Sequence, residues 1–174
     1  LGRVEHVQRF HDTYHNEAMI AMLGLHRQSW TDRLQLSLRY AQYYKEIQTG
    51  VRQSIVFGER HRRGYSWSPT LEYVRRQLLD GHLDLTLMTS YTQARSTLID
   101  TTAYKYNWRG ERELGLGLGE QGYAHNRDDE RTWTASLSSL LRLRSGAALK
   151  LSHQFSHFTR ETSSLLARQT VGTD

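Results

Sequence analysis

The sequence predicts an all-β protein, an antiparallel up-and-down meander of about six strands that forms part of a larger transmembrane β-barrel. Stretches of alternating apolar and polar residues recur along the chain, and short and long connections alternate between them. The residues between the apolar positions are mostly Ser, Thr and Gln. The clearest stretch is 83–91, with leucine at 83, 85 and 87 and tyrosine at 91. A period of two places successive side chains on opposite faces of a strand.

The composition limits the class of protein. Of 174 residues, 37% are apolar, and no run of about twenty apolar residues exists to form a membrane helix. A barrel strand needs only alternate residues to be apolar, so a membrane protein remains compatible with these numbers. The absence of cysteine excludes disulfides and thiolate metal sites. One proline and ten tyrosines favour strands over disorder.

Six strands follow from the alternation. The first, within 14–25, has two competing phases, because either Ala18, Ile20 and Met22 or Met19, Ala21 and Leu23 could share a face. The other five place every second residue on an apolar face over 34–40, 65–73, 83–91, 133–143 and 149–155. Pro69 falls on the apolar face of its strand and predicts a bulge or an irregular ladder there, because proline lacks an N–H.

The connections run short, long, short, long, short. We expect long outer loops at about 41–63 and 95–131 and short periplasmic turns at about 28–32, 77–81 and 144–147. A meander segregates its connections in this way when one end lies near the inner side of a membrane and the other projects outward.

The two faces of the strands differ in chemistry. The apolar face carries leucine in mid-strand and tyrosine or tryptophan toward the strand ends, where lipid–water interfaces select these amphipathic rings. The opposite face is rich in Ser, Thr and Gln, whereas a soluble sheet presents Lys and Glu to water. We therefore expect the leucines to contact lipid and the hydroxyl groups to line a wet lumen. The aromatic residues by themselves are also compatible with a soluble protein, in which they would cap the hydrophobic core.

Six strands are too few to close a membrane barrel, since about eight is the smallest workable number. An open edge in lipid leaves backbone groups unpaired at a cost of several kcal/mol each. We therefore expect more chain to complete the barrel, and we treat 1–174 as one partial barrel domain.

Four separate motifs resemble the barrel of TonB-dependent outer-membrane receptors of the Bacteroidetes type. They are FHDTY at 10–14, SWTD at 29–32, YKEIQTG at 44–50 and IDTTAYKYNWRGE at 99–111. The resemblance covers roughly residues 10–160 and implies a barrel of about 22 strands with an N-terminal plug. It also implies a place in the bacterial outer membrane and the import of a scarce nutrient of the siderophore, haem-like, glycan or peptide class, driven by energy relayed by TonB.

The same resemblance implies the partners. These are outer-membrane lipid and lipopolysaccharide, the rest of the barrel and its plug, the TonB complex through an N-terminal part, and a surface lipoprotein as a further candidate. The sequence departs from the full pattern, because it shows no plug, no TonB-contacting segment and no aromatic C-terminal strand. We therefore expect a section from the first half of the barrel.

Two loops contain candidate ligand-binding residues. The second loop carries Tyr104, Tyr106, Trp108 and Arg109, whose rings and guanidinium could stack on a sugar, an aromatic chelator or a peptide side chain. Packing of the loop against its neighbours is the alternative. The first loop carries Arg60, His61 and Arg62, beside Arg63, Tyr43 and Tyr44. These residues could attract an anionic ligand or a lipopolysaccharide phosphate, or could form a solvated basic rim.

No motif predicts an enzyme, a cofactor or a metal site. Gly115–Gly119 lacks the flanking strand and helix of a phosphate-binding βαβ unit, so a flexible loop is the better interpretation. His11 and His15 would lie about 13 Å apart on a strand, although His61 or His125 in the loops could touch a haem-like or metal-bearing ligand. Interleaved charges, as in 127–131, argue against nucleic-acid binding. The alternative functions are a soluble lipocalin-like ligand-binding barrel and a small closed outer-membrane barrel in adhesion.

Overall fold

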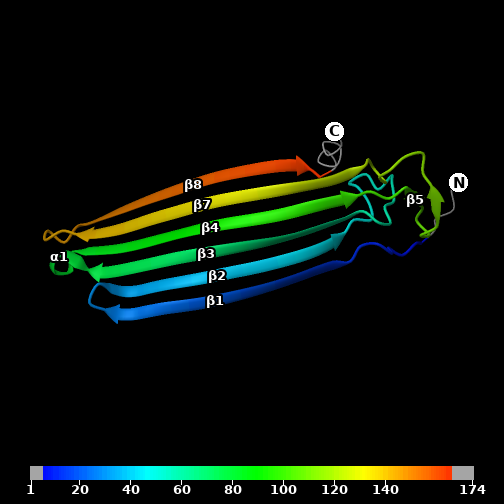
Figure 1. Cartoon of the computed structure of the whole chain (residues 1–174). Helices are drawn as coiled ribbons and strands as arrows, with labels where there is room; N and C mark the ends of the chain where they lie inside the picture. Colours follow the sequence, from blue (N-terminus) through cyan, green and yellow to red (C-terminus); the bar gives the residue numbers. More distant parts are fainter. Residues whose placement is uncertain (1–5, 166–174) are drawn as a thin grey trace, which may run out of the picture.

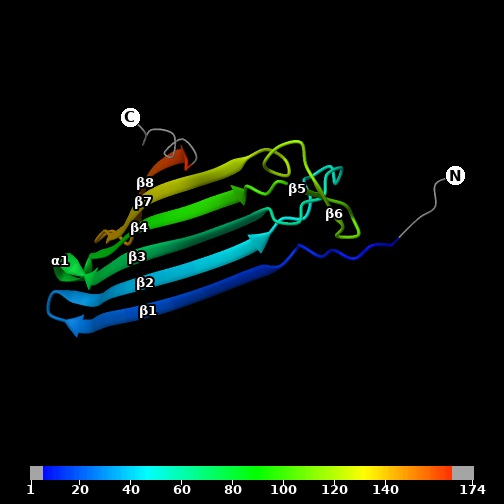
Figure 2. The same ribbon diagram turned by 45° about the vertical axis from the view of Figure 1, so that its right-hand side comes forward.

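A six-stranded antiparallel sheet is the main feature of the computed structural model, which describes residues 6–165 (Figure 1). The strands lie side by side in chain order, so the predicted all-β up-and-down meander is confirmed. They are β1 (Tyr14–Gln28), β2 (Thr31–Glu46), β3 (His61–Gln77), β4 (Leu83–Asp100), β7 (Ala124–Arg142) and β8 (Ala148–Ser164). Figure 2 shows the sheet as one open layer, with the long loops gathered beyond one end.

Short and long connections lie at opposite ends of the sheet (Figure 1). The short ones are residues 29–30, 78–82 and 143–147, close to the three predicted turns. The middle turn contains α1 (Leu78–Gly81), which is not a regular helix, because Leu79 and Asp80 have left-handed φ values of 53° and 56°. The long connections are residues 47–60 and 101–123, and the second contains a separate hairpin of β5 (Tyr104–Tyr106) and β6 (Arg112–Leu114).

The strands extend further toward the long connections than the alternation indicates. The predicted loops at 41–63 and 95–131 include residues that pair in the sheet, as far as Glu46 with His61 and Asp100 with Ala124. Charged pairs hold these strand ends, as where Arg95 Nε donates to Asp129 Oδ1 over 2.6 Å. Cross-strand ion pairs stabilise a ladder without leaving a hydrophobic period in the sequence, so the pattern ends before the strands do.

The register of the sheet defines two faces. We call one the leucine face; it carries the odd-numbered residues of β1, β3, β4, β7 and β8 and the even-numbered residues of β2. The phase that the sequence left open in β1 is settled by the pairing of Leu23 with Leu36, which places Met19, Ala21 and Leu23 on this face. At Pro69 the β3–β4 ladder is interrupted, but the register is the same on both sides.

The opposite face, which we call the hydroxyl face, is held together by side-chain hydrogen bonds across strands. Ser68 and Thr92 are joined by a 2.7 Å hydroxyl contact, and Ser90 and Thr134 by another of 2.7 Å. Within residues 6–165 no second layer of structure packs on either face of the sheet. The described residues bury only three apolar side chains, two of them in a long loop, so the sheet has no hydrophobic core of its own. No helix in this part of the chain is long and apolar enough to cross a membrane.

Candidate functional site

An exposed apolar band crosses the half of the leucine face that is nearer the short turns. In β4 the band covers the nine residues from Leu83 to Tyr91, and in β2 it runs from Leu34 to Tyr40. Its side chains are accessible, with Leu23 76% and Trp133 53% exposed. Apolar side chains on adjacent strands are therefore left without cover by the described residues.

Aromatic residues form the border of this band on the side of the long loops. The Trp67 and Tyr91 rings are 5.6 Å apart, and Trp133 and Phe155 meet edge to face at 5.9 Å. The indole N–H of Trp133 donates to Thr89 Oγ1 over 2.9 Å. Rings with one apolar side and one hydrogen-bonding group suit a boundary between an apolar and a wet environment.

The aromatic border runs obliquely across the sheet. A line of directly paired residues that starts at Tyr40 in β2 crosses β3, β4 and β7 and ends at Thr159 in β8. A border at right angles to the strands would follow this line. The border aromatic of β8 is Phe155, four residues nearer the short turn than Thr159. Four residues span ~13 Å along a strand and the four strand spacings ~19 Å, so the border makes an angle of about 35° with the direction across the strands.

The other border of the band shifts in the same sense. Leu34, the border residue in β2, pairs with Tyr73, and Tyr73 pairs with Leu87 in β4. In β4 the band continues four residues further toward the short turns, to Leu83. The whole band is therefore slanted relative to the strands.

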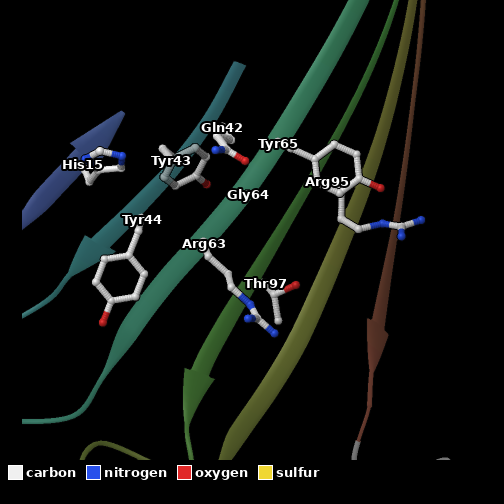
Figure 3. A pocket seen from close by; sticks show the side chains of 9 residues that line it. All are labelled: His15, Gln42, Tyr43, Tyr44, Arg63, Gly64, Tyr65, Arg95 and Thr97. Atoms are coloured by element: carbon white, nitrogen blue, oxygen red, sulfur yellow. The ribbon is translucent and has the colours of Figure 1, made fainter. Parts of the chain in front are cut away.

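A cavity of about 480 Å³ opens just beyond the aromatic border, toward the long loops (Figure 3). It is lined by His15, Gln42, Tyr43, Tyr44, Arg63, Gly64, Tyr65, Arg95 and Thr97. All of these except Tyr43 and Gly64 belong to the leucine face by register. Tyr65 lies two residues along β3 from Trp67, so the cavity begins at the first pair beyond the border. Its lining contains two arginines and no carboxylate.

The two arginines of the cavity have different partners. The guanidinium of Arg95 donates to Asp129 and lies 5.7 Å from the centre of the Tyr65 ring. Arg63 makes no hydrogen bond or ion pair with any residue in 6–165, and its side chain lies beside Thr97, its register partner (Figure 3). The cavity therefore combines a positioned cation with an available one, which suits an anionic ligand.

Two buried carboxylates join the long loops to each other and to the sheet. Glu120, which is 2% exposed, accepts the backbone N–H groups of Gly58, Glu59 and Arg60 over 2.5, 3.0 and 2.8 Å. Asp100, at the end of β4, accepts those of Glu120 and Gln121. These carboxylates take the place of the backbone partners that an irregular segment lacks. The loops are therefore ordered at their base.

The start of the described chain is attached to the same cluster. Gln48 Oε1 accepts the backbone N–H groups of Phe10 and His11 over 2.9 and 3.1 Å. His11 Nε2 lies 2.7 Å from the carbonyl oxygen of Arg60. Phe57, 1% exposed, packs beneath the Arg60 guanidinium, which lies 4.8 Å from the centre of its ring. Sequence reasoning missed Gln48, Phe57, Asp100 and Glu120, because lone polar and aromatic residues in loops carry no periodic signal.

The structure places Tyr104 and Tyr106 on one side of β5, and both rings are already in contact with the protein. Arg112 lies over the Tyr104 ring, 4.4 Å from its centre. The Tyr106 hydroxyl donates to Glu59 Oε1 over 2.6 Å, and a Cβ at Gly58 would lie 2.5 Å from its ring. Burial raises the pKa of Tyr106, and the hydrogen bond to Glu59 raises it further. These two tyrosines pack the loop, which is the alternative that the sequence left open.

Trp108 and Arg109 occupy the turn between β5 and β6. Asn107 Oδ1 accepts the backbone N–H groups of Arg109 and Glu111, which orders the turn. Trp108 lines a second cavity of about 490 Å³, together with His6, Val7, Arg9 and Gln53. Tyr106 also lines a smaller cavity of about 300 Å³ on this hairpin. The binding role of Trp108 stays a prediction.

The structure does not gather Arg60, His61 and Arg62 into a single site. Arg60 is held in the loop cluster by Phe57 and by Gln121. His61 belongs to the leucine face, and its Nδ1 lies 2.8 Å from the carbonyl oxygen of Glu59, which is the acceptor of this contact. Arg62 is exposed on the hydroxyl face. The neighbouring Arg63 lines the cavity beside the aromatic border instead.

No protein-family model matches the chain, and a search of curated proteins found no match. Within residues 6–165, no three His, Cys, Asp or Glu side chains are arranged to hold a metal ion.

Proposed function

We propose that the chain is a section of the β-barrel of a TonB-dependent outer-membrane receptor, which imports a nutrient. The slanted apolar band is the observation that carries this proposal. A lipid layer cuts tilted barrel strands at positions that shift steadily from one strand to the next. The angle of about 35° falls within the strand tilt of roughly 35–45° in membrane barrels. A sheet in water meets no planar boundary that would impose such a shift.

The length of the band supports the same proposal. Nine residues in β4 match the roughly 9–11 residues with which a tilted strand crosses the hydrocarbon layer. β4 has 18 residues in total, so about half of the strand would extend beyond the lipid on the side of the long loops. On the leucine face that half carries the charged pair of Arg95 with Asp129, as expected for a wet environment. The charged pairs near the short turns, Arg33 with Glu72 and Arg142 with Asp84, lie on the hydroxyl face. The hydroxyl face would then line the lumen.

The free edges of β1 and β8 support membership of a larger barrel. Within residues 6–165 neither edge has a partner strand. In hydrocarbon, each unpaired backbone group along such an edge costs several kcal/mol. Further strands on both sides would remove this cost, and with them the receptor would include the plug and the contact to the TonB complex.

The long-loop end would hold the ligand. The buried carboxylates of Asp100 and Glu120 give the loops a rigid base, and Trp108 lines an open cavity there. An indole beside an arginine suits a siderophore, a haem-like group, a glycan or a peptide side chain. A surface lipoprotein that covers the loops is a further candidate partner.

Single-cysteine variants test the direction in which the faces point, because the chain has no native cysteine. Leu87→Cys and Thr86→Cys lie next to each other in β4, on the leucine and hydroxyl faces. In the full-length protein in outer-membrane vesicles, a polarity-sensitive dye should report an apolar environment and contact with lipid-borne quenchers at position 87. At position 86 it should report water and quenching by iodide.

The reverse pattern, or equal quenching at both positions, would contradict the proposal. A purified chain that is soluble without detergent, with both positions shielded from lipid quenchers, would favour a lipocalin-like barrel. Lipid contact at position 87 without any energy-dependent uptake in the full-length protein would favour a barrel in adhesion.

A further inference from the structure

The cavity next to the aromatic border has a defined height in the proposed barrel, and the following inference rests on that proposed function. Tyr65 and Arg95 form the first pair beyond Trp67 on the leucine face, and Arg63 and Thr97 form the next. One pair advances ~7 Å along a strand. The cavity would therefore face outward, immediately above the hydrocarbon layer and at the level of the lipid headgroups of the outer leaflet.

The chemistry of the cavity fits a phosphate group on a sugar. A guanidinium presents a planar fork of donors that matches phosphate, and the free guanidinium here is Arg63. The Tyr44 and Tyr65 side chains add hydroxyl donors and aromatic faces to the lining. The second cation, Arg95, is held in place by Asp129, so it can contribute charge without first being ordered.

The carboxylates around the cavity are already engaged. Glu46, two residues along β2 from Tyr44 and on the same face, accepts the backbone N–H of Thr13 over 2.9 Å. Glu17 accepts a hydrogen bond from Gln42 over 2.7 Å and lies 3.0 Å from His15 Nε2. Asp129 accepts from both Arg95 and Arg127, over 2.6 and 2.7 Å. Their negative charge is therefore directed toward these partners, and the positive charge of Arg63 is left uncompensated among the described residues.

We propose that this cavity binds a phosphate group of lipopolysaccharide in the outer leaflet, with Arg63 as the main contact. A nutrient in transit would pass along the hydroxyl face, on the other side of the sheet, so the cavity is separate from the import route. A phosphorylated glycolipid is the anion that is present at this height outside the barrel. The bound glycolipid would hold the receptor at a fixed depth in the membrane.

The test measures binding of bisphosphorylated lipid A to the full-length, delipidated protein in detergent by native mass spectrometry. Arg63→Gln should weaken binding about tenfold or more, because it removes a charge-assisted, bidentate contact. Arg62→Gln is the matched control, since it removes an equally exposed arginine from the neighbouring position on the opposite face. It should keep the wild-type affinity for lipid A.

Two further arms identify the source of the phosphate. Lipid A from which both phosphates have been removed should bind the wild-type protein as weakly as intact lipid A binds the Arg63→Gln variant. Inorganic phosphate alone should not displace bound lipid A. Displacement by inorganic phosphate would overturn the assignment to a lipid, and unchanged binding of the dephosphorylated form would overturn the role of phosphate.

Different experimental results would reject the glycolipid site and the proposed barrel. Equal binding of lipid A by wild-type, Arg63→Gln and Arg62→Gln proteins, together with lipid contact at position 87, would reject the glycolipid site and leave the barrel intact. Water at position 87 would reject the orientation of the barrel and the glycolipid site with it.

Discussion

Glu120 in the second long loop accepts the backbone N–H of Arg60 in the first, with 2.8 Å between Oε2 and N. Sixty residues separate the two in the chain. The same carboxylate accepts the N–H groups of Gly58 and Glu59, so one buried side chain satisfies three successive donors. This contact makes the two loops a single structural unit above the sheet.

Replacement of Glu120 should loosen that unit. Glu120→Ala leaves three partly buried N–H groups without their acceptor. A fully buried unsatisfied group costs about 1–3 kcal/mol, which sets the upper limit for each of them. Hydrogen exchange of residues 56–60 in the full-length protein should accelerate, while the strands keep their protection. Glu113→Ala, at an exposed position in β6, is the control and should change little. Equal acceleration in both variants would show that Glu120 is not the anchor.

The proposed orientation of β4 in the membrane predicts a strongly unequal cost for adjacent arginines. Leu87 is the middle residue of the nine in the band, so Leu87→Arg should destabilise the folded barrel by roughly 2–4 kcal/mol. Thr86→Arg lies on the hydroxyl face, which would line the lumen of the proposed barrel, and should cost far less. Equilibrium folding of the full-length protein into lipid vesicles in urea measures both. Similar costs for the two variants would show that the leucine face does not meet lipid.

A role of Trp108 in ligand binding predicts a loss of uptake without a loss of receptor. Trp108→Ala should weaken ligand binding about tenfold, as expected for an aromatic contact residue, and should leave the amount of protein at the cell surface unchanged. Trp30→Ala, in a short turn at the opposite end of the sheet, removes an indole that is more exposed than Trp108 and should have no effect on uptake. Unchanged uptake in the Trp108 variant would remove this loop from the site.

The segment before β1 should be held less firmly against the end of β2 at acid pH. Hydrogen bonding by the Thr13 side chain lowers the pKa of Glu46 despite partial burial, and the Thr13 N–H, 2.9 Å from Glu46 Oε2, lowers it further, as do His11 and His61. Because the pKa is lower in the folded protein, the contribution is present at neutral pH and is lost as the pH falls through that lowered value.

A spin label at position 7 should therefore become more mobile as the medium is acidified below the ordinary pKa range of a glutamate. In the Glu46→Gln variant this carboxyl titration is removed, and the mobility should no longer change in that range. An identical acid transition in both proteins would assign the change to another group.

The strands and the two faces of β2, β3, β4, β7 and β8 could be predicted from the sequence, because the period of two is a property of neighbouring residues. Leu83, Leu85 and Leu87 share a face in any strand that contains them. The polar character of the residues between them then indicated two different environments. The short turns were also visible, since turn residues interrupt the alternation locally.

Features that depend on pairing between distant segments could be determined only from the tertiary structure. The phase of β1 follows from its ladder with β2, and the strand ends follow from ion pairs such as Arg95 with Asp129. The slant of the band appears only when the registers of six strands are known together.

The candidate binding site and the loop anchor also could not be predicted from neighbouring residues alone. Nothing in the sequence near Arg63 distinguishes it from Arg62, and the register alone assigns them to opposite faces. Glu120 and Gly58 meet across 62 positions of chain, a contact that no local pattern encodes. The alternation of apolar and polar residues and the composition are properties of neighbouring residues in the chain. A cavity or a loop anchor forms only where the hydrogen-bonded ladder brings distant residues together.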